Sequence, residues 1–174
     1  MKYSQIILCG KRCTGKTTLL WNLQSALNWP VFSVSEYLRD LIRMYHFTPE
    51  DIDRKRLIIS KDIDQRMLGL LKTNNPCIID ARVFGFVEQS FPHAVKVLLT
   101  SDDRVRIERS SKREGSTIEK AENRLTKKEN EWLQQMREIY GHQNFFNPQY
   151  YDLVIDTTNS NPDEILRKVL LFLA

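Results

Sequence analysis

The sequence of 174 residues has the length of one domain, and its 41% hydrophobic and 28% charged residues are typical of a globular fold, not a disordered or fibrous one. Its formal net charge is only +4, with 26 Lys and Arg mixed among 22 Asp and Glu, which favours a small anionic ligand over a nucleic acid. The three cysteines lack paired spacing and the apolar runs are short, which argues against a disulfide framework, a zinc site, a signal peptide and a membrane span. We expect a cytoplasmic monomer without a membrane partner.

Apolar runs rich in β-branched residues alternate with helical patterns along the chain. The runs occupy residues 5–9, 30–34, 77–80, 95–99 and 152–156. Helix starts are indicated by polar capping residues followed by carboxylates: Ser33 with Glu36, Thr48-Pro49 before two acids, Ser116 with Glu119, and Asn161-Pro162 with Glu164. The alternation predicts βαβ units in an α/β fold with a parallel sheet, and we expect one domain over residues 1–174 because no repeat or linker interrupts it.

A long helical pattern covers residues 117–140. Its apolar stripe is interpreted as a core contact, with a partner-binding face as the alternative; the stripe comprises Ile118, Ala121, Leu125, Trp132, Met136 and Ile139. Gly115 precedes this pattern and separates it from the charged stretch "SSKRE", so it predicts either a hinge or a simple corner between two helices.

The stretch "CGKRCTGKTT" follows the first apolar run and precedes a helical pattern. It satisfies the Walker A spacing of a phosphate-binding loop, and the strand before it and the helix after it are the context that this motif requires. Backbone N–H groups and the helix N-terminus would surround a phosphate, Lys16 would reach the β- and γ-phosphates of ATP, and the Thr17 hydroxyl would ligate Mg²⁺. The predicted ATP phosphate-binding residues are Gly10, Lys11, Arg12, Cys13, Thr14, Gly15, Lys16, Thr17 and Thr18.

The remaining motifs favour a small kinase among the proteins with such a loop. The chain lacks the Asn-Lys-x-Asp stretch of guanine-specific switch proteins and is short for a mechanical ATPase. Asp80 ends the strand pattern "CIID", at the sheet edge where α/β folds bind ligands, and is predicted to hold Mg²⁺ or its waters. Arg82 and Arg39 each follow a predicted strand and are predicted to clamp an acceptor phosphate.

The whole chain resembles the cytidylate kinase family of nucleoside monophosphate kinases, in particular its short archaeal-type members. The resemblance rests on "CGKRCTGKTT", "FSVSEYLRDL", "DIDQRM", "IIDAR", "RVRIERSSKREG" and "YDLVIDTT", and it extends from residue 4 to about residue 170. It implies a three-layer P-loop fold with a five-stranded parallel sheet of order 2-3-1-4-5. It also implies a helical monophosphate-binding region at 35–75, and a lid with its helix at 109–140.

The resemblance also implies roles for individual residues. Asp64 and Arg66 would lie near the acceptor base, and the implied acceptor-binding set is Ser33, Arg39, Asp64, Arg66 and Arg82. Arg109 and Arg113 would belong to the lid and act in catalysis with Lys16 and Arg82. The chain departs from the family in carrying Ser35 and Ala81 where glycine is common, and "LQQ" at 133–135 where arginines are common.

ATP-dependent phosphorylation of a nucleoside monophosphate, CMP or dCMP first, is therefore the leading hypothesis, with Mg²⁺ as the metal and nucleotides as the small-molecule partners. One alternative is a kinase of a metabolite hydroxyl such as shikimate or gluconate, with Asp64 or Glu36 as base. The other is a regulatory or RNA-associated module that hydrolyses ATP slowly or not at all.

Overall fold

Five parallel strands form the central sheet of the computed structural model, which describes residues 2–86, 91–141 and 144–174. The strands are β1 (Gln5–Gly10), β2 (Val31–Ser33), β3 (Cys77–Arg82), β4 (Ala94–Thr100) and β5 (Leu153–Asp156). They are ordered β2-β3-β1-β4-β5, which confirms the predicted topology. Because β1 pairs with β3 on one side and β4 on the other, it is buried along its whole length.

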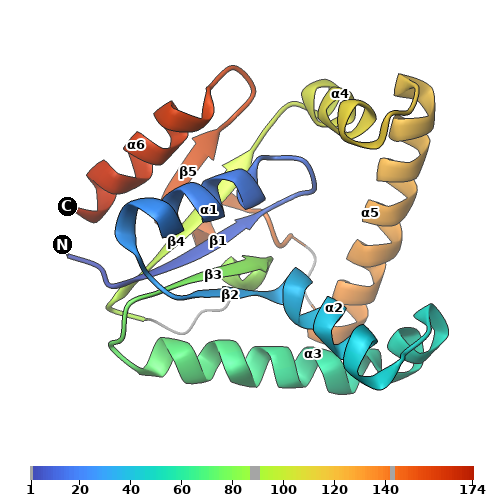
Figure 1. Cartoon of the computed structure of the whole chain (residues 1–174), viewed down its shortest axis with the longest axis horizontal. Helices are drawn as coiled ribbons and strands as arrows, with labels where there is room; N and C mark the ends of the chain where they lie inside the picture. Colours follow the sequence, from blue (N-terminus) through green and yellow to red (C-terminus); the bar gives the residue numbers. More distant parts are fainter. Residues whose placement is uncertain (1, 87–90, 142–143) are drawn as a thin grey trace.

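Helices cover both faces of the sheet and give the predicted three layers. On one face, α1 (Lys16–Leu27) and α6 (Pro162–Leu173) pack against the side chains that β1 and β4 present to that face. On the other, α3 (Pro49–Lys72) and the short 3₁₀ helix η1 (Phe84–Phe86) enclose a second apolar cluster. The remaining helices are α2 (Val34–Tyr45), α4 (Asp103–Glu114), α5 (Ile118–Tyr140) and the 3₁₀ helix η2 (Pro148–Tyr150). In Figure 1, α5 crosses beyond the carboxyl ends of β1 and β3.

Three of the four predicted helix starts are correct. The Ser33 hydroxyl accepts the Glu36 N–H, and both Thr48 and Asn161 form capping boxes. The fourth is wrong by one residue, because Thr117 caps α5 by accepting the Lys120 N–H. Gly115 ends α4 in the left-handed conformation, with φ 59°, and the following Ser116 N–H donates to the Ser111 carbonyl oxygen. Ser116 therefore belongs to the corner between the helices and not to the cap.

The apolar stripe of α5 has two parts with different surroundings. Ala121 and Leu125 are buried, as a core contact requires, whereas Ile118 is 51% exposed. Trp132 and Met136 are only half-buried and line a cavity beside α3. The core interpretation therefore holds for Ala121 and Leu125 and is wrong for Ile118, Trp132 and Met136.

The two regions named from the sequence fall on helices of this fold. Residues 35–75 span α2 and α3, and residues 109–140 run from the second half of α4 through α5. In the part of the chain that the structure describes, none of the helices combines the length and the apolar character that crossing a bilayer requires.

Candidate active site

The phosphate-binding loop lies between β1 and α1, where two glycines have the positive φ angles that its tight path requires. Gly10 has φ 139°, and a side chain there would collide with the Leu99 carbonyl oxygen; Gly15 has φ 91° and precedes the first residue of α1. Lys16 Nζ donates to the carbonyl oxygens of Gly10 at 2.8 Å and Lys11 at 2.9 Å. The ammonium group is thus held inside the loop, beside the α1 N-terminus where phosphates bind.

Burial sets the electrostatics around Lys16. It lowers the pKa of Lys16 to about 8, opposed by the nearby Asp80 carboxylate and reinforced by Arg82. Burial likewise raises the pKa of Asp80, while Lys16, Arg82 and a hydrogen bond from the Ser33 hydroxyl work in the opposite direction. The lysine and the carboxylate therefore stabilise each other's charged forms in a partly desolvated site.

Two cavities meet at this loop. One, of about 610 Å³, lies between the loop, α4 and the start of α6, and Arg109, Thr157 and Pro162 contribute to its wall. The other, of about 450 Å³, is bounded by the end of β3 and by α2, α3 and α5. Both cavities are lined by Cys13, Lys16, Thr17 and Arg113. Of the four residues predicted to act in catalysis, Lys16 and Arg113 therefore lie where the two spaces join, whereas Arg109 lines only the first cavity and Arg82 only the second.

Arg82 lies at the end of β3 with a backbone that few non-glycine residues adopt. Its φ is 35°, next to an irregularity in the β1–β3 register. Its guanidinium carbon lies 3.6 Å from the centre of the Trp132 ring, and its Nη2 lies 3.6 Å from Glu129 Oε1. Burial, with Arg12 nearby, lowers the pKa of Arg82 to about 9. Its buried Nε and Nη2 atoms have no hydrogen-bond partner among the described residues.

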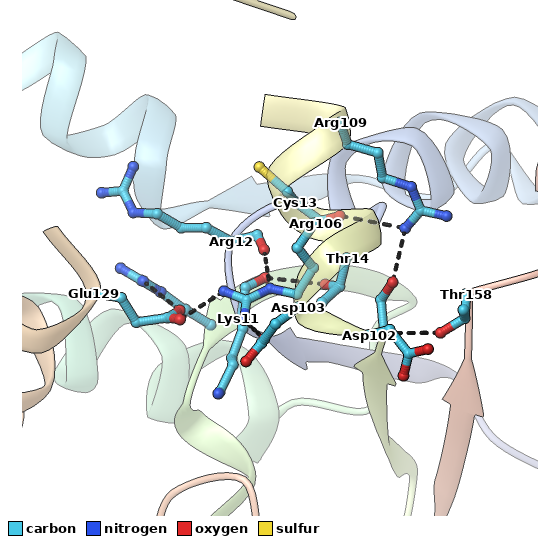
Figure 2. Close-up of polar contacts among 12 residues, drawn as sticks. Lys11, Arg12, Cys13, Thr14, Asp102, Asp103, Arg106, Arg109, Glu129 and Thr158 are labelled. Atoms are coloured by element: carbon cyan, nitrogen blue, oxygen red, sulfur yellow. Dashed lines mark hydrogen bonds and ion pairs between the residues drawn. The ribbon is translucent and has the colours of Figure 1, made fainter. Parts of the chain in front are cut away.

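Glu129 connects Arg82 to the buried Arg106, which the sequence analysis missed. Arg106 Nη2 donates to Glu129 Oε2 at 2.6 Å, and its Nε donates to the Arg12 carbonyl oxygen at 2.8 Å. Figure 2 shows the Arg106 side chain of α4 reaching between the loop and Glu129 of α5. Glu129 and Trp132 are one helical turn apart, so both lie on one face of α5. A single sequence does not indicate that this face belongs to a functional site.

Arg109 is fixed to the phosphate-binding loop and to the end of β5. Its Nη1 donates to the Cys13 carbonyl oxygen at 3.3 Å, and its Nη2 donates to the Thr157 carbonyl oxygen at 2.6 Å. Arg113, one turn further along α4, is 60% exposed and pairs with its neighbour Glu114 at 3.4 Å. Arg109 is therefore anchored at several points, whereas the exposed Arg113 pairs with a neighbour on its own helix.

Two of the residues expected at the acceptor lie in the second cavity. Arg82 lines it, and so does Asp64, whose carboxylate oxygens accept hydrogen bonds from Tyr140 Oη at 3.0 and 2.9 Å. Burial raises the pKa of Asp64, opposed by the tyrosine hydrogen bond. Ser33 is buried beneath the site as the cap of α2 and donates to Asp80.

Arg39 and Arg66 lie outside the cavity, contrary to expectation. The Arg39 side chain is 61% exposed and pairs with Glu36 of its own helix at 3.7 Å. Arg66 donates to Asp62 at 2.9 Å and stacks on the Tyr37 ring. Each pairs with an acid one turn earlier on its own helix, which neither the position of Arg39 after a strand nor the resemblance that implies Arg66 reveals. Arg56 lines the cavity instead and donates to Asp53 at 2.9 Å.

The residues present fit a magnesium ion that arrives with a nucleotide. Asp80 and the Thr17 hydroxyl line the same cavity and both supply oxygen ligands, which Mg²⁺ prefers. No cluster of three or more His, Cys, Asp or Glu that could hold a metal occurs among the described residues. The protein would supply only one carboxylate and one hydroxyl to the cation, and the substrate phosphates would supply further ligands, as is common for Mg²⁺.

The sheet order, the glycine-bearing loop and the buried lysine together define a P-loop nucleotide-binding protein. The model of the AAA domain family matches residues 6–134, and the chain belongs to this family. Among curated proteins, the chain is similar to the cytidylate kinase of Haloarcula marismortui, with 24% identity over 95% of this chain and 86% of the relative. It is also similar to the cytidylate kinase of Pyrococcus furiosus, with 26% identity over 92% and 83% of the two chains.

Solved structures agree with the fold. An uncharacterised protein from Eubacterium ventriosum superposes with a TM-score of 0.71 at 15% identity, covering 97% of both chains. A shikimate kinase from Bacteroides thetaiotaomicron has a TM-score of 0.61 at 16% identity over 97% of both chains. A gluconokinase from Sinorhizobium meliloti has a TM-score of 0.60 at 17% identity over 99% of this chain and 92% of its own.

Proposed function

We propose that the chain is a kinase that transfers the γ-phosphoryl group of ATP to a nucleoside monophosphate, CMP or dCMP, and yields the diphosphate. The observation that carries the proposal is the junction of the two cavities at Lys16, Thr17 and Arg113. A donor in the larger cavity and an acceptor in the smaller one would have their phosphates meet at these side chains. The similarity to archaeal cytidylate kinases supports the choice of acceptor.

The acceptor cavity has the polar groups that a nucleotide requires at its two ends. Arg82 offers unpartnered N–H donors near the loop, which suits a phosphate dianion. Asp64 offers carboxylate lone pairs that Tyr140 does not use, which suits the amino group of a base. Between them the wall includes apolar side chains such as Ile59, Ile63 and Met136, which suit the faces of a planar ring.

The reaction needs orientation and charge neutralisation more than proton transfer, because the attacking group is already an anion. Lys16 would neutralise charge on the transferred group, Arg82 would hold the acceptor phosphate in line, and Arg113 would close over the junction. Mg²⁺ held by Thr17 and Asp80 would supply further charge neutralisation on the donor phosphates.

An acceptor panel tests the proposal. ATP consumption is measured with each common ribo- and deoxyribonucleoside monophosphate, with shikimate and gluconate, and with RNA, using Lys16→Ala as the inactive control. Consumption stimulated by CMP or dCMP supports the proposal. Stimulation by a hydroxyl metabolite alone, or turnover that depends on RNA and on none of the monophosphates, contradicts it.

Asp64→Asn separates base recognition from phosphate recognition. The amide presents both donors and acceptors, so discrimination between CMP and UMP should fall about tenfold while the KM for ATP stays unchanged. Asp62→Asn is the matched control on the same helix, since Asp62 pairs with Arg66 outside the cavity. Unchanged discrimination in Asp64→Asn would remove Asp64 from base recognition.

A further inference from the structure

The end of β3 holds an arginine whose surroundings are incomplete. The Arg82 side chain is 19% exposed, yet its Nε and Nη2 atoms are buried and have no hydrogen-bond partner among the described residues, and the same holds for the facing Glu129 Oε1. The two groups are 3.6 Å apart, close enough for charge attraction and too far for a hydrogen bond. Buried charged groups normally satisfy their hydrogen bonds, so the unused donors of Arg82 indicate a ligand that is still to bind.

Glu129 is itself held through the carboxylate oxygen that does not face Arg82. Its Oε2 accepts a 2.6 Å hydrogen bond from Arg106, a side chain only 3% exposed. Arg106 is fixed in turn by the Arg12 carbonyl oxygen and by Asp103. The carboxylate is therefore a rigid negative group behind Arg82, and its position is tied to the phosphate-binding loop.

Trp132 supplies the second support. The Arg82 guanidinium lies over its ring at 3.6 Å, and the ring belongs to the same face of α5 as Glu129. A planar guanidinium that is stacked on an aromatic ring cannot rotate freely, so its donor edges keep one direction. Both supports come from α5, which contributes none of the residues predicted for catalysis or acceptor binding.

We propose that Glu129 and Trp132 are positioning residues, which fix the Arg82 guanidinium so that its free donors receive the acceptor phosphate. The inference rests on the proposed function and deepens it. When the phosphate binds, it supplies the acceptor atoms that Arg82 lacks. Because the Glu129 carboxylate also accepts a hydrogen bond from Arg106, it fixes the position of Arg82 relative to the loop that would hold the donor phosphates.

A double-mutant cycle tests the coupling. Glu129→Gln keeps the shape and removes the charge, so the KM for the acceptor monophosphate should rise about tenfold with little change in the KM for ATP. In an Arg82→Ala background, the same substitution should have almost no further effect. Glu131→Gln is the control on the same helix, because Glu131 is exposed and pairs only weakly with Lys127. Equal losses in both backgrounds would overturn the proposal.

Trp132 provides variants that leave the buried charges intact if Glu129→Gln does not fold. Trp132→Leu removes the ring beneath Arg82 and should also raise the KM for the acceptor, and Trp132→Phe should restore most of it. An acceptor KM that is unchanged by Trp132→Leu, or a loss that persists undiminished in Trp132→Phe, would contradict the positioning role.

A binding measurement makes the inference independent of phosphoryl transfer. With the loop filled by a non-hydrolysable ATP analogue, inorganic phosphate is titrated while tryptophan fluorescence is followed. The fluorescence of Trp132 is the difference between the signal of the unmodified chain and that of Trp132→Phe. This difference should change when phosphate binds, and the change should be absent in Arg82→Ala. This response without turnover on any monophosphate would refute the proposed function alone. No such response, in a protein that does phosphorylate monophosphates, would refute the positioning role alone.

Discussion

Arg109 donates a 2.6 Å hydrogen bond to the carbonyl oxygen of Thr157 and so joins α4 to the residue that follows β5. The same guanidinium reaches the Thr157 hydroxyl at 3.1 Å and the Cys13 carbonyl oxygen at 3.3 Å. Three segments far apart in the sequence therefore converge on one side chain at the wall of the larger cavity. This side chain therefore ties α4 to the phosphate-binding loop and to the end of β5.

Arg109→Ala should therefore weaken both ATP binding and the fold. A hydrogen bond from a charged donor is worth about 1.5–3 kcal/mol, and for a chain of this size the loss of one such bond lowers Tm by about 3–12 °C. The KM for ATP should rise about tenfold because the loop loses a support. Thermal denaturation and steady-state kinetics measure the two effects; an unchanged Tm would show that α4 is held by other contacts.

Arg113→Ala, unlike Arg109→Ala, should lower the rate of phosphoryl transfer without weakening the fold or ATP binding. Its side chain is 60% exposed and lines both cavities, so its removal should leave Tm nearly unchanged and lower kcat at least about tenfold, with ATP affinity within about twofold. Single-turnover rates and analogue binding separate these quantities. Parallel losses in kcat and in ATP affinity would assign Arg113 to ground-state binding of ATP.

Lys16 should make ATP binding depend on pH. Burial lowers its pKa in the free protein to about 8, so the ammonium that attracts phosphates is lost as the pH rises through that value. The dissociation constant of a non-hydrolysable ATP analogue should be flat below pH 7 and rise about tenfold for each unit well above pH 8. Lys16→Ala should bind weakly with no such rise, and a rise of equal slope in that variant would assign the titration to another group.

Asp80→Asn should raise the Mg²⁺ concentration needed for half-maximal activity by about ten- to a hundredfold, since an amide is a weaker ligand for a hard cation and its waters. The buried carboxylate also balances the charge of Lys16, so the pKa of Lys16 should fall in this variant. Metal titrations at two pH values distinguish the effects. Metal dependence equal to that of the unmodified chain would leave Asp80 only the second role.

Arg82 and Arg39 should differ sharply as acceptor ligands. Arg82→Ala should raise the KM for the monophosphate about ten- to a hundredfold, because it removes charged donors from the cavity. Arg39→Ala should change it less than about threefold, because Arg39 forms only an exposed ion pair with Glu36. A large loss in Arg39→Ala, confined to the acceptor, would mean that α2 closes inward when the acceptor binds.

The sequence predicts the parts of this protein that depend on local rules. Alternating apolar runs predict the sheet, and the spacing from Gly10 to Thr17 predicts the loop that the structure forms. Arg39 was predicted at the acceptor because it follows a strand, and Arg66 because the family resemblance implies it, but each pairs with an acid of its own helix. Local spacing cannot show which side of a helix a neighbouring element will cover.

The buried network escaped prediction for a different reason. Arg106 and Glu129 are 23 residues apart and resemble the many exposed charges around them. Their burial follows from the way α5 crosses the ends of the strands, which is a tertiary property. Trp132 was assigned to the core because aromatic residues at helical spacing usually pack there, whereas here its ring faces Arg82.

Because Lys16, Thr17 and Arg113 line both cavities, one molecule that joins two nucleosides through a chain of phosphates would contact both spaces at once. Its second half would bind at an effective concentration in the millimolar range or above, without a second loss of translational freedom. Such a compound should compete with ATP and with the acceptor alike, and bind far more tightly than either half. The number of linking phosphates that gives the tightest binding would then report the distance between the two bound substrates.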